Sequence, residues 1–194
     1  MREKKKIKIT RHREVHTYCE LWWTAHSMLM QGRSEEDTSH SQFMGSLVFT
    51  AFSLEAFLNH IGPKLFQCWS DLERLGPKEK LNVLAEKLGV TVDYGKRPWQ
   101  IIKKLFEFRN DLAHGKSIKV LEENVVTLSR YNHRSIVLAR TRWEKFCTHE
   151  NAERAREDVE KIVHTLSEAS GLEEHPFIGG WQETDATLEE KSPG

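Results

Sequence analysis

The sequence of 194 residues has few cysteines and no excess of charge of either sign. Its three cysteines, Cys19, Cys68 and Cys147, are odd in number and widely spaced, so they predict neither a disulfide framework nor a CxxC metal site. This cysteine usage favours a reducing compartment, and we expect a cytoplasmic protein. Basic and acidic residues both number 29, so bulk charge does not indicate a protein that coats nucleic acid, although a local basic site stays open.

Long hydrophobic runs and cofactor motifs are also missing. The most apolar stretch, 47–58, is interrupted by Thr50, Ser53 and Glu55, so we expect no membrane-spanning helix and no membrane partner. No apolar segment follows the charged residues 1–13, which argues against a signal peptide. The sequence contains no glycine-rich phosphate loop, no HExxH, no GxSxG and no zinc-ligand spacing. We therefore predict a protein without a metal ion or cofactor.

Charge is concentrated at the two ends. Residues 1–13 carry seven basic side chains against one acidic, and residues 171–194 carry six acidic side chains against one basic. A basic arm over 1–11 is suited to contact an anionic partner such as RNA, but a solvated arm explains the same composition. The tail over 171–194 lacks periodicity, so we expect it to be acidic and poorly ordered.

The middle of the chain has helical periodicity. Six segments repeat apolar residues at the 3.6-residue period of a helix, namely 12–30, 42–60, 78–88, 98–114, 135–146 and 152–169. Gly62-Pro63 should stop or kink the second helix, and Pro98 should open the fourth at its first position. Residues 116–130 fit either a strand or a poor helix. The sequence predicts an all-α helical bundle over 12–170.

One segment, Phe106-Glu-Phe-Arg-Asn-Asp-Leu-Ala-His-Gly115, gathers side chains suited to catalysis at a predicted helix end. Arg109 can bind a phosphate because its planar guanidinium donates two hydrogen bonds and stays charged. His114 can accept or donate a proton near neutral pH. Metal-free RNA cleavage needs such a base for the ribose 2′-OH and a cation for the charge that grows on the phosphate.

This segment resembles the HEPN family (higher-eukaryote and prokaryote nucleotide-binding domains), whose ribonuclease members carry an Arg-x(4–6)-His motif, usually with a polar residue after the Arg. Arg109, Asn110 and His114 match that motif with a four-residue spacer. The apolar segment 46–62, with an acidic residue inside it, resembles the family's second long helix. The resemblance covers about residues 12–170 and implies a homodimeric, metal-independent ribonuclease that leaves a 2′,3′-cyclic phosphate. It further suggests a role in toxin–antitoxin systems or antiviral defence, with an antitoxin or nucleotidyltransferase as partner.

The spacing alone has little value, because four Arg–His pairs in this chain fit it. Only the pair Arg109–His114 has an apolar approach, an Asn after the Arg and a Gly after the His. Two other readings stay open. In the first, the chain is a non-catalytic HEPN module that binds nucleotide, RNA or a partner protein, and Arg109 bridges two helices. In the second, it is a plain helical adaptor.

Supporting residues follow from helix geometry. Residues five apart on a straight helix point about 140° apart, so one copy of the motif does not easily present both side chains to one phosphate. In the family that the segment resembles, the protein is a homodimer, and the motifs of both copies face one shared cleft. Glu55 and Asn59 share a helix face, and Glu55 either pairs with Arg109 or lies at a solvent-facing edge. Either RNA contact or simple solvation explains the basic side chains that flank the motif, which are Lys103, Lys104 and Lys116.

Overall fold

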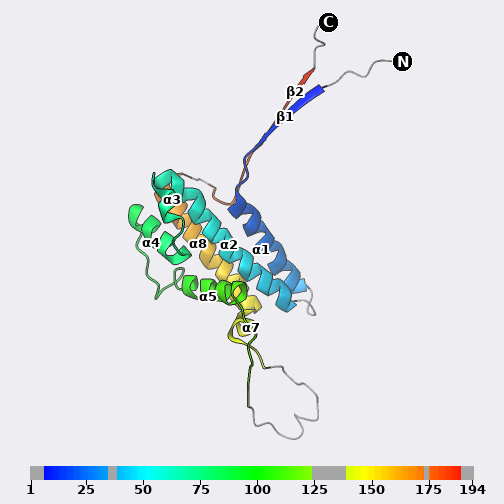
Figure 1. The fold of residues 1–194 in the computed structure, drawn as a ribbon, viewed down its shortest axis with the longest axis vertical. Helices are drawn as coiled ribbons and strands as arrows, with labels where there is room; N and C mark the ends of the chain where they lie inside the picture. Colours follow the sequence, from blue (N-terminus) through cyan, green and yellow to red (C-terminus); the bar gives the residue numbers. More distant parts are fainter. Residues whose placement is uncertain (1–6, 35–38, 124–138, 173–174, 189–194) are drawn as a thin grey trace, which may run out of the picture.

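The computed structural model describes residues 7–34, 39–123, 139–172 and 175–188, and these form a mostly helical protein with one small sheet (Figure 1). In chain order the elements are β1 (Ile7–Arg13), α1 (Thr17–Ser34), α2 (Ser39–Leu65), α3 (Trp69–Leu72), α4 (Pro77–Lys87), α5 (Ile101–Ala113), α7 (Arg142–Phe146), α8 (His149–Ser170) and β2 (Gln182–Leu188). The predicted helical class is confirmed.

Helix α2 is the centre of the molecule. It packs against α1 and α8 along its length and against α4 and α5 near its second half (Figure 1). Its apolar side chains point in almost every direction, which suits a helix that is surrounded by other helices. The fully buried ones are Leu47, Ala51, Leu54, Phe57, Leu58 and Ile61. By length and composition α2 could also cross a membrane, but this is weak evidence, because half of its most apolar window is buried inside the protein.

Several predicted helix boundaries are wrong. The helix predicted from residue 12 begins at Thr17, because residues 7–13 form β1. Of the stop or kink predicted at Gly62-Pro63, the stop is wrong, because α2 continues through Pro63 to Leu65. Proline removes only one backbone donor, and the bare Cα of Gly62 lets the Trp69 ring lie where a Cβ would be only 2.2 Å from it. Helix α5 begins at Ile101 instead of Pro98, because residues 98–100 form turns. Of the predicted helix 135–146, residues 142–146 form α7, and 135–138 lie outside the described residues.

The two ends of the chain pair with each other. Strands β1 and β2 form an antiparallel ribbon, from Ile7 opposite Leu188 to Arg13 opposite Gln182, that projects from the helices (Figure 1). Residues 7–11 of the predicted basic arm therefore belong to a strand, which is exposed along its whole length. The all-α description also needs this sheet added. The sheet forms because each strand satisfies the backbone hydrogen-bond donors and acceptors of the other, although the strands lie at opposite ends of the sequence.

The expectation of a poorly ordered tail is wrong where the tail docks, because Pro176 and Phe177 are buried, while residues 178–186 are exposed. Phe177 is only 9% exposed, and its ring stacks on Trp22 of α1 at 4.2 Å between centroids. The Cys19 thiol donates to the Pro176 carbonyl, and the Trp23 indole N–H donates to the Phe177 carbonyl, both at 3.3 Å. One buried aromatic ring and two backbone contacts thus hold the segment on α1.

This docking leads to a stability prediction. Phe177→Ala should cost about 2–4 kcal/mol, because it removes a buried ring and leaves a gap beside Trp22. For a chain of this size that cost corresponds to a decrease in melting temperature of roughly 5–15 °C, measured by circular dichroism. The control is Ile178→Ala at the adjacent residue, which is 75% exposed and should melt like the wild type. Equal melting temperatures for Phe177→Ala and the wild type would contradict the docked tail.

Candidate functional site

The candidate site lies at the C-terminal end of α5. The apolar face of this helix is buried in the core through Ile101, Ile102, Leu105, Phe106 and Phe108. The helix ends at Ala113, and His114 follows as its C-cap, with its backbone N–H donating to the Asn110 carbonyl at 2.9 Å. The 3.6-residue period that buries the apolar face turns Arg109 toward α2 and leaves Asn110 and His114 exposed.

Arg109 bridges α5 and α2. One guanidinium nitrogen donates to the Glu55 carboxylate, and the other terminal nitrogen donates to the Asn110 side-chain carbonyl at 2.9 Å. The side chains of Arg109 and Glu55 are only 17% and 24% exposed, so solvent screens this ion pair little. The Arg109 guanidinium also lies over the rings of Phe52 and Phe106, 5.8 and 5.7 Å from their centroids. Of the two alternatives for Glu55, the structure has the pairing with Arg109.

A second cation joins this cluster from α4. Lys80, only 3% exposed, donates to the Asn59 side-chain carbonyl at 2.9 Å, and its ammonium lies 3.9 Å from Glu55. Sequence reasoning missed Lys80. Its spacing was the available signal, because positions 80, 84 and 88 share one helix face. The other two residues on that face, at 84 and 88, are leucines.

The cluster carries one acid against two bases and has an unused donor. The buried Nε of Arg109 has no hydrogen-bond partner among the described residues. A buried donor without an acceptor costs free energy. Arg109 therefore carries a net positive charge beside Glu55 that is only partly matched by hydrogen bonds.

His114 faces a separate, open hollow of about 600 Å³. Its lining residues are Asn110, Asp111, His114, Gly115, Lys116, Ile118, Val120, Thr141, Arg142 and Trp143. Thr141 accepts from the backbone N–H of Glu144 and caps α7, and this cap fixes the start of the helix that carries Arg142. The hollow thus combines a histidine with two cationic side chains.

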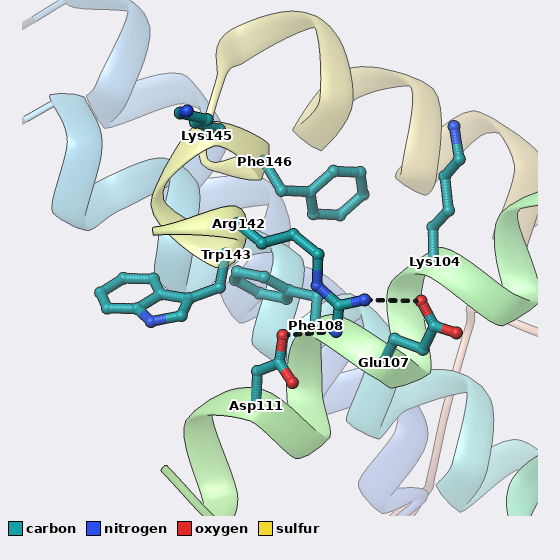
Figure 2. A pocket seen from close by; sticks show the side chains of 8 residues that line it. All are labelled: Lys104, Glu107, Phe108, Asp111, Arg142, Trp143, Lys145 and Phe146. Atoms are coloured by element: carbon teal, nitrogen blue, oxygen red, sulfur yellow. Dashed lines mark hydrogen bonds and ion pairs between the residues drawn. The ribbon is translucent and has the colours of Figure 1, made fainter. Parts of the chain in front are cut away.

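Arg142 of α7 is tied to α5. It donates to Asp111 at 2.8 Å and lies 3.5 Å from Glu107, as Figure 2 shows for the neighbouring hollow of about 340 Å³. The hydrogen bond to Asp111, followed by the charge of that carboxylate, raises the pKa of Arg142 above its ordinary value. The sequence did not point to the pair of Asp111 and Arg142, because 31 residues separate them.

The structure brings together some predicted residues and separates others. Arg109, Asn110, Glu55 and Asn59 lie in one connected cluster, which Lys80 links to Glu55 and Asn59. His114 and Lys116 line the open hollow, and Asn110 belongs to both groups, whereas Arg109 does not line the hollow. The other two candidate RNA contacts, Lys103 and Lys104, lie nearer the opposite end of α5.

The described part of the chain offers neither a cluster of metal ligands nor a reactive thiol beside the site. Among the described residues, no three His, Cys, Asp or Glu side chains lie close enough together to hold a metal ion. Burial, followed by the charge of Glu144, raises the pKa of the Cys147 thiol to about 12. That thiol is protonated at neutral pH and is a poor nucleophile.

Compared with family models, curated proteins and solved structures, the chain matches none. The described residues define a mostly helical protein with a half-buried Arg–Glu ion pair and, at the end of the same helix α5, an exposed histidine. Its function is therefore argued from these side chains.

Proposed function

We propose that the chain is a metal-independent endoribonuclease of HEPN type, active in the cytoplasm as a homodimer. The observation that carries the proposal is the end of α5, where Arg109 is held by Glu55 and Asn110 one turn before His114. These residues supply a phosphate-binding cation and a proton-transfer group without a metal ion.

The proposed reaction starts at the ribose 2′-OH. A His114 imidazole removes the proton, and the 2′ oxygen attacks the adjacent phosphorus. The bond from phosphorus to the 5′ oxygen breaks, the leaving oxygen takes a proton, and the product is a 2′,3′-cyclic phosphate with a 5′-OH. Arg109 stabilises the charge on the phosphate oxygens, and Asn110 orients the guanidinium.

A second copy of the chain would complete the site. Within one chain, Arg109 lies in the cluster with Glu55 while His114 faces the open hollow, so the two side chains do not line one cavity. A two-fold axis at the end of α5 would bring both motifs to one cleft and provide one histidine as base and the other as acid. Ile118 and Val120, exposed beside the hollow, are apolar surface suited to such a contact.

Dimerisation is directly measurable. Light scattering of the purified protein at tens of micromolar should give about twice the chain mass of 22.6 kDa. The variant Ile118→Glu should lower this mass, because it places a charge in the proposed contact, whereas Ile178→Glu at a distant exposed residue should not. A wild type that remains monomeric at this concentration would contradict the shared cleft.

Cleavage of total RNA tests the proposed function. The wild type should cleave RNA equally well in EDTA and in Mg²⁺, because its cation is an arginine. Loss of cleavage in EDTA that Mg²⁺ or Mn²⁺ restores would contradict the mechanism. Absence of cleavage under both conditions would contradict the assignment as a ribonuclease.

The second candidate is a non-catalytic module that binds nucleotide, RNA or a partner protein. The observation in its favour is that Arg109 is already paired and largely buried. In that case the wild type would leave RNA intact, and replacing Arg109 would lower stability alone. The ribonuclease proposal includes a role in antiviral defence and an antitoxin or nucleotidyltransferase as partner. A gene for such a partner next to the gene of this protein would support the proposal.

A further inference from the structure

A basic hollow lies at the opposite end of α5 from the candidate site. It has a volume of about 310 Å³, and its walls come from α4, the turn before α5, α5 itself, α7 and α8. Its lining residues are Lys78, Tyr94, Gln100, Ile101, Lys103, Lys104, Phe146, Asn151 and Arg154. Four of these side chains are cationic and none is acidic. We call this cavity the basic hollow.

Neighbouring acids neutralise these cations only in part. Lys103 lies 4.0 Å from Glu107, and Arg154 lies 3.9 Å from Asp158, so both pairs are at the limit of ion pairing. Asp158 is already bound at 2.7 Å by Arg97. Lys104 has no ion pair with the described residues, and the Lys78 ammonium lies over the Tyr94 ring, 4.7 Å from its centroid. The basic hollow therefore keeps a positive field.

The start of α5 also lines the basic hollow. Gln100 and Ile101 are the N-cap and first residue of this 13-residue helix, and its first turn contains no acidic residue. The backbone N–H groups of Gln100 and Ile101 already donate to the Lys96 and Pro98 carbonyls. The positive field of the basic hollow therefore comes from its four cationic side chains.

We propose that the basic hollow binds a small molecule that carries a phosphomonoester or pyrophosphate group. Lys78, Lys103, Lys104 and Arg154 would surround the phosphoryl oxygens. Tyr94 and Phe146 would pack against the apolar part of the ligand, and the amides of Gln100 and Asn151 would donate to it. Its volume is at the lower end of the range for pockets that hold small organic ligands.

Charge density favours a compact ligand over a nucleic-acid strand. Each phosphodiester of a strand carries one negative charge, and successive charges are spread along the chain. Four cations that line one small cavity instead match a group that carries two or more negative charges at one place. The basic hollow is also distinct from the motif, because α5 between Ile101 and Ala113 spans about 18 Å.

Calorimetric titration of the full chain with inorganic pyrophosphate tests the proposal. We expect saturable binding of one pyrophosphate per chain, weakened at least 10-fold in the double variant Lys78→Ala/Arg154→Ala. The matched control is Lys161→Ala, which removes an exposed cation of α8 outside the basic hollow and should bind like the wild type. Both altered side chains in the double variant are exposed, so its melting curve should stay close to that of the wild type.

Three results would overturn the proposal. One is the absence of saturable pyrophosphate binding by the wild type. Another is an equal loss of binding in Lys161→Ala, which would indicate a bulk charge effect. The third is binding of a single-stranded RNA at this cavity that pyrophosphate does not displace, which would assign it to a strand. Because His114→Ala should bind pyrophosphate normally, failure of the ribonuclease proposal would be seen separately.

Discussion

Replacement of His114 by alanine should reduce RNA cleavage by roughly 10²–10⁴-fold, which is the usual contribution of a general acid or base. The measurement is the initial rate on one RNA in EDTA. The fold should be unaffected, because the His114 side chain is exposed and makes no hydrogen bond with the described residues. Its backbone N–H donates to the Asn110 carbonyl, and alanine retains that bond.

A second histidine provides the control for His114. His175 is exposed and lies in the segment that docks on α1, away from the end of α5. His175→Ala should therefore cleave RNA like the wild type. If His114→Ala also cleaves at the wild-type rate, proton transfer takes place at another residue, and the site assignment is wrong even if the protein is a ribonuclease.

Replacement of Arg109 by alanine should damage both activity and stability. Loss of the phosphate contact should slow cleavage by about 10²–10³-fold, or roughly 3–4 kcal/mol of barrier. Folding should lose about 1–3 kcal/mol, because among the described residues Glu55 then keeps only Lys80, at 3.9 Å, as a charged partner. Arg109→Lys should recover part of the stability but little activity, since an ammonium does not reproduce the planar two-pronged donor.

A double-mutant cycle separates the two effects of Arg109. The stability cost of Arg109→Ala should be smaller in a Glu55→Ala background, because no unpaired carboxylate remains, whereas the loss of cleavage should persist. Arg74→Ala, at an exposed arginine outside the cluster, is the control and should change neither quantity. An Arg109→Ala variant as stable and active as the wild type would contradict both roles.

The helices were predictable because their signal is local. In α2 and α8 the apolar residues repeat at the helical period, and the observed bounds differ from the predicted ones by a few residues. The ribbon was not predictable in the same way. Strands β1 and β2 pair residues more than 160 positions apart, and β1 is exposed along its whole length, so no buried face marks it in the sequence.

The docked tail was missed for a related reason. Phe177 and Trp181 are the two aromatic residues of the predicted tail, and two residues are too few to form a periodic pattern. The contact of Phe177 with Trp22 depends on tertiary packing.

The site was predictable where it depends on neighbouring positions of one helix. Arg109, Asn110 and His114 lie within six residues, so their position at the end of α5 follows from the helix itself. Contacts between helices were harder. The Glu55–Arg109 pair was one of two alternatives because an acid in an apolar helix needs a partner. Lys80 and Arg142 come from other helices, and their places depend on how α4 and α7 pack on the core.

The most direct test of the ribonuclease assignment is the chemistry of the product ends. One RNA and its 2′-O-methyl counterpart are incubated with the wild type in EDTA, and the fragments are analysed by mass spectrometry. The account predicts fragments with a 2′,3′-cyclic phosphate and a 5′-OH from the RNA, and no cleavage of the methylated strand, because its 2′ oxygen has no proton to lose. Fragments with a 5′-phosphate, or cleavage of the methylated strand, would contradict attack by the 2′-OH.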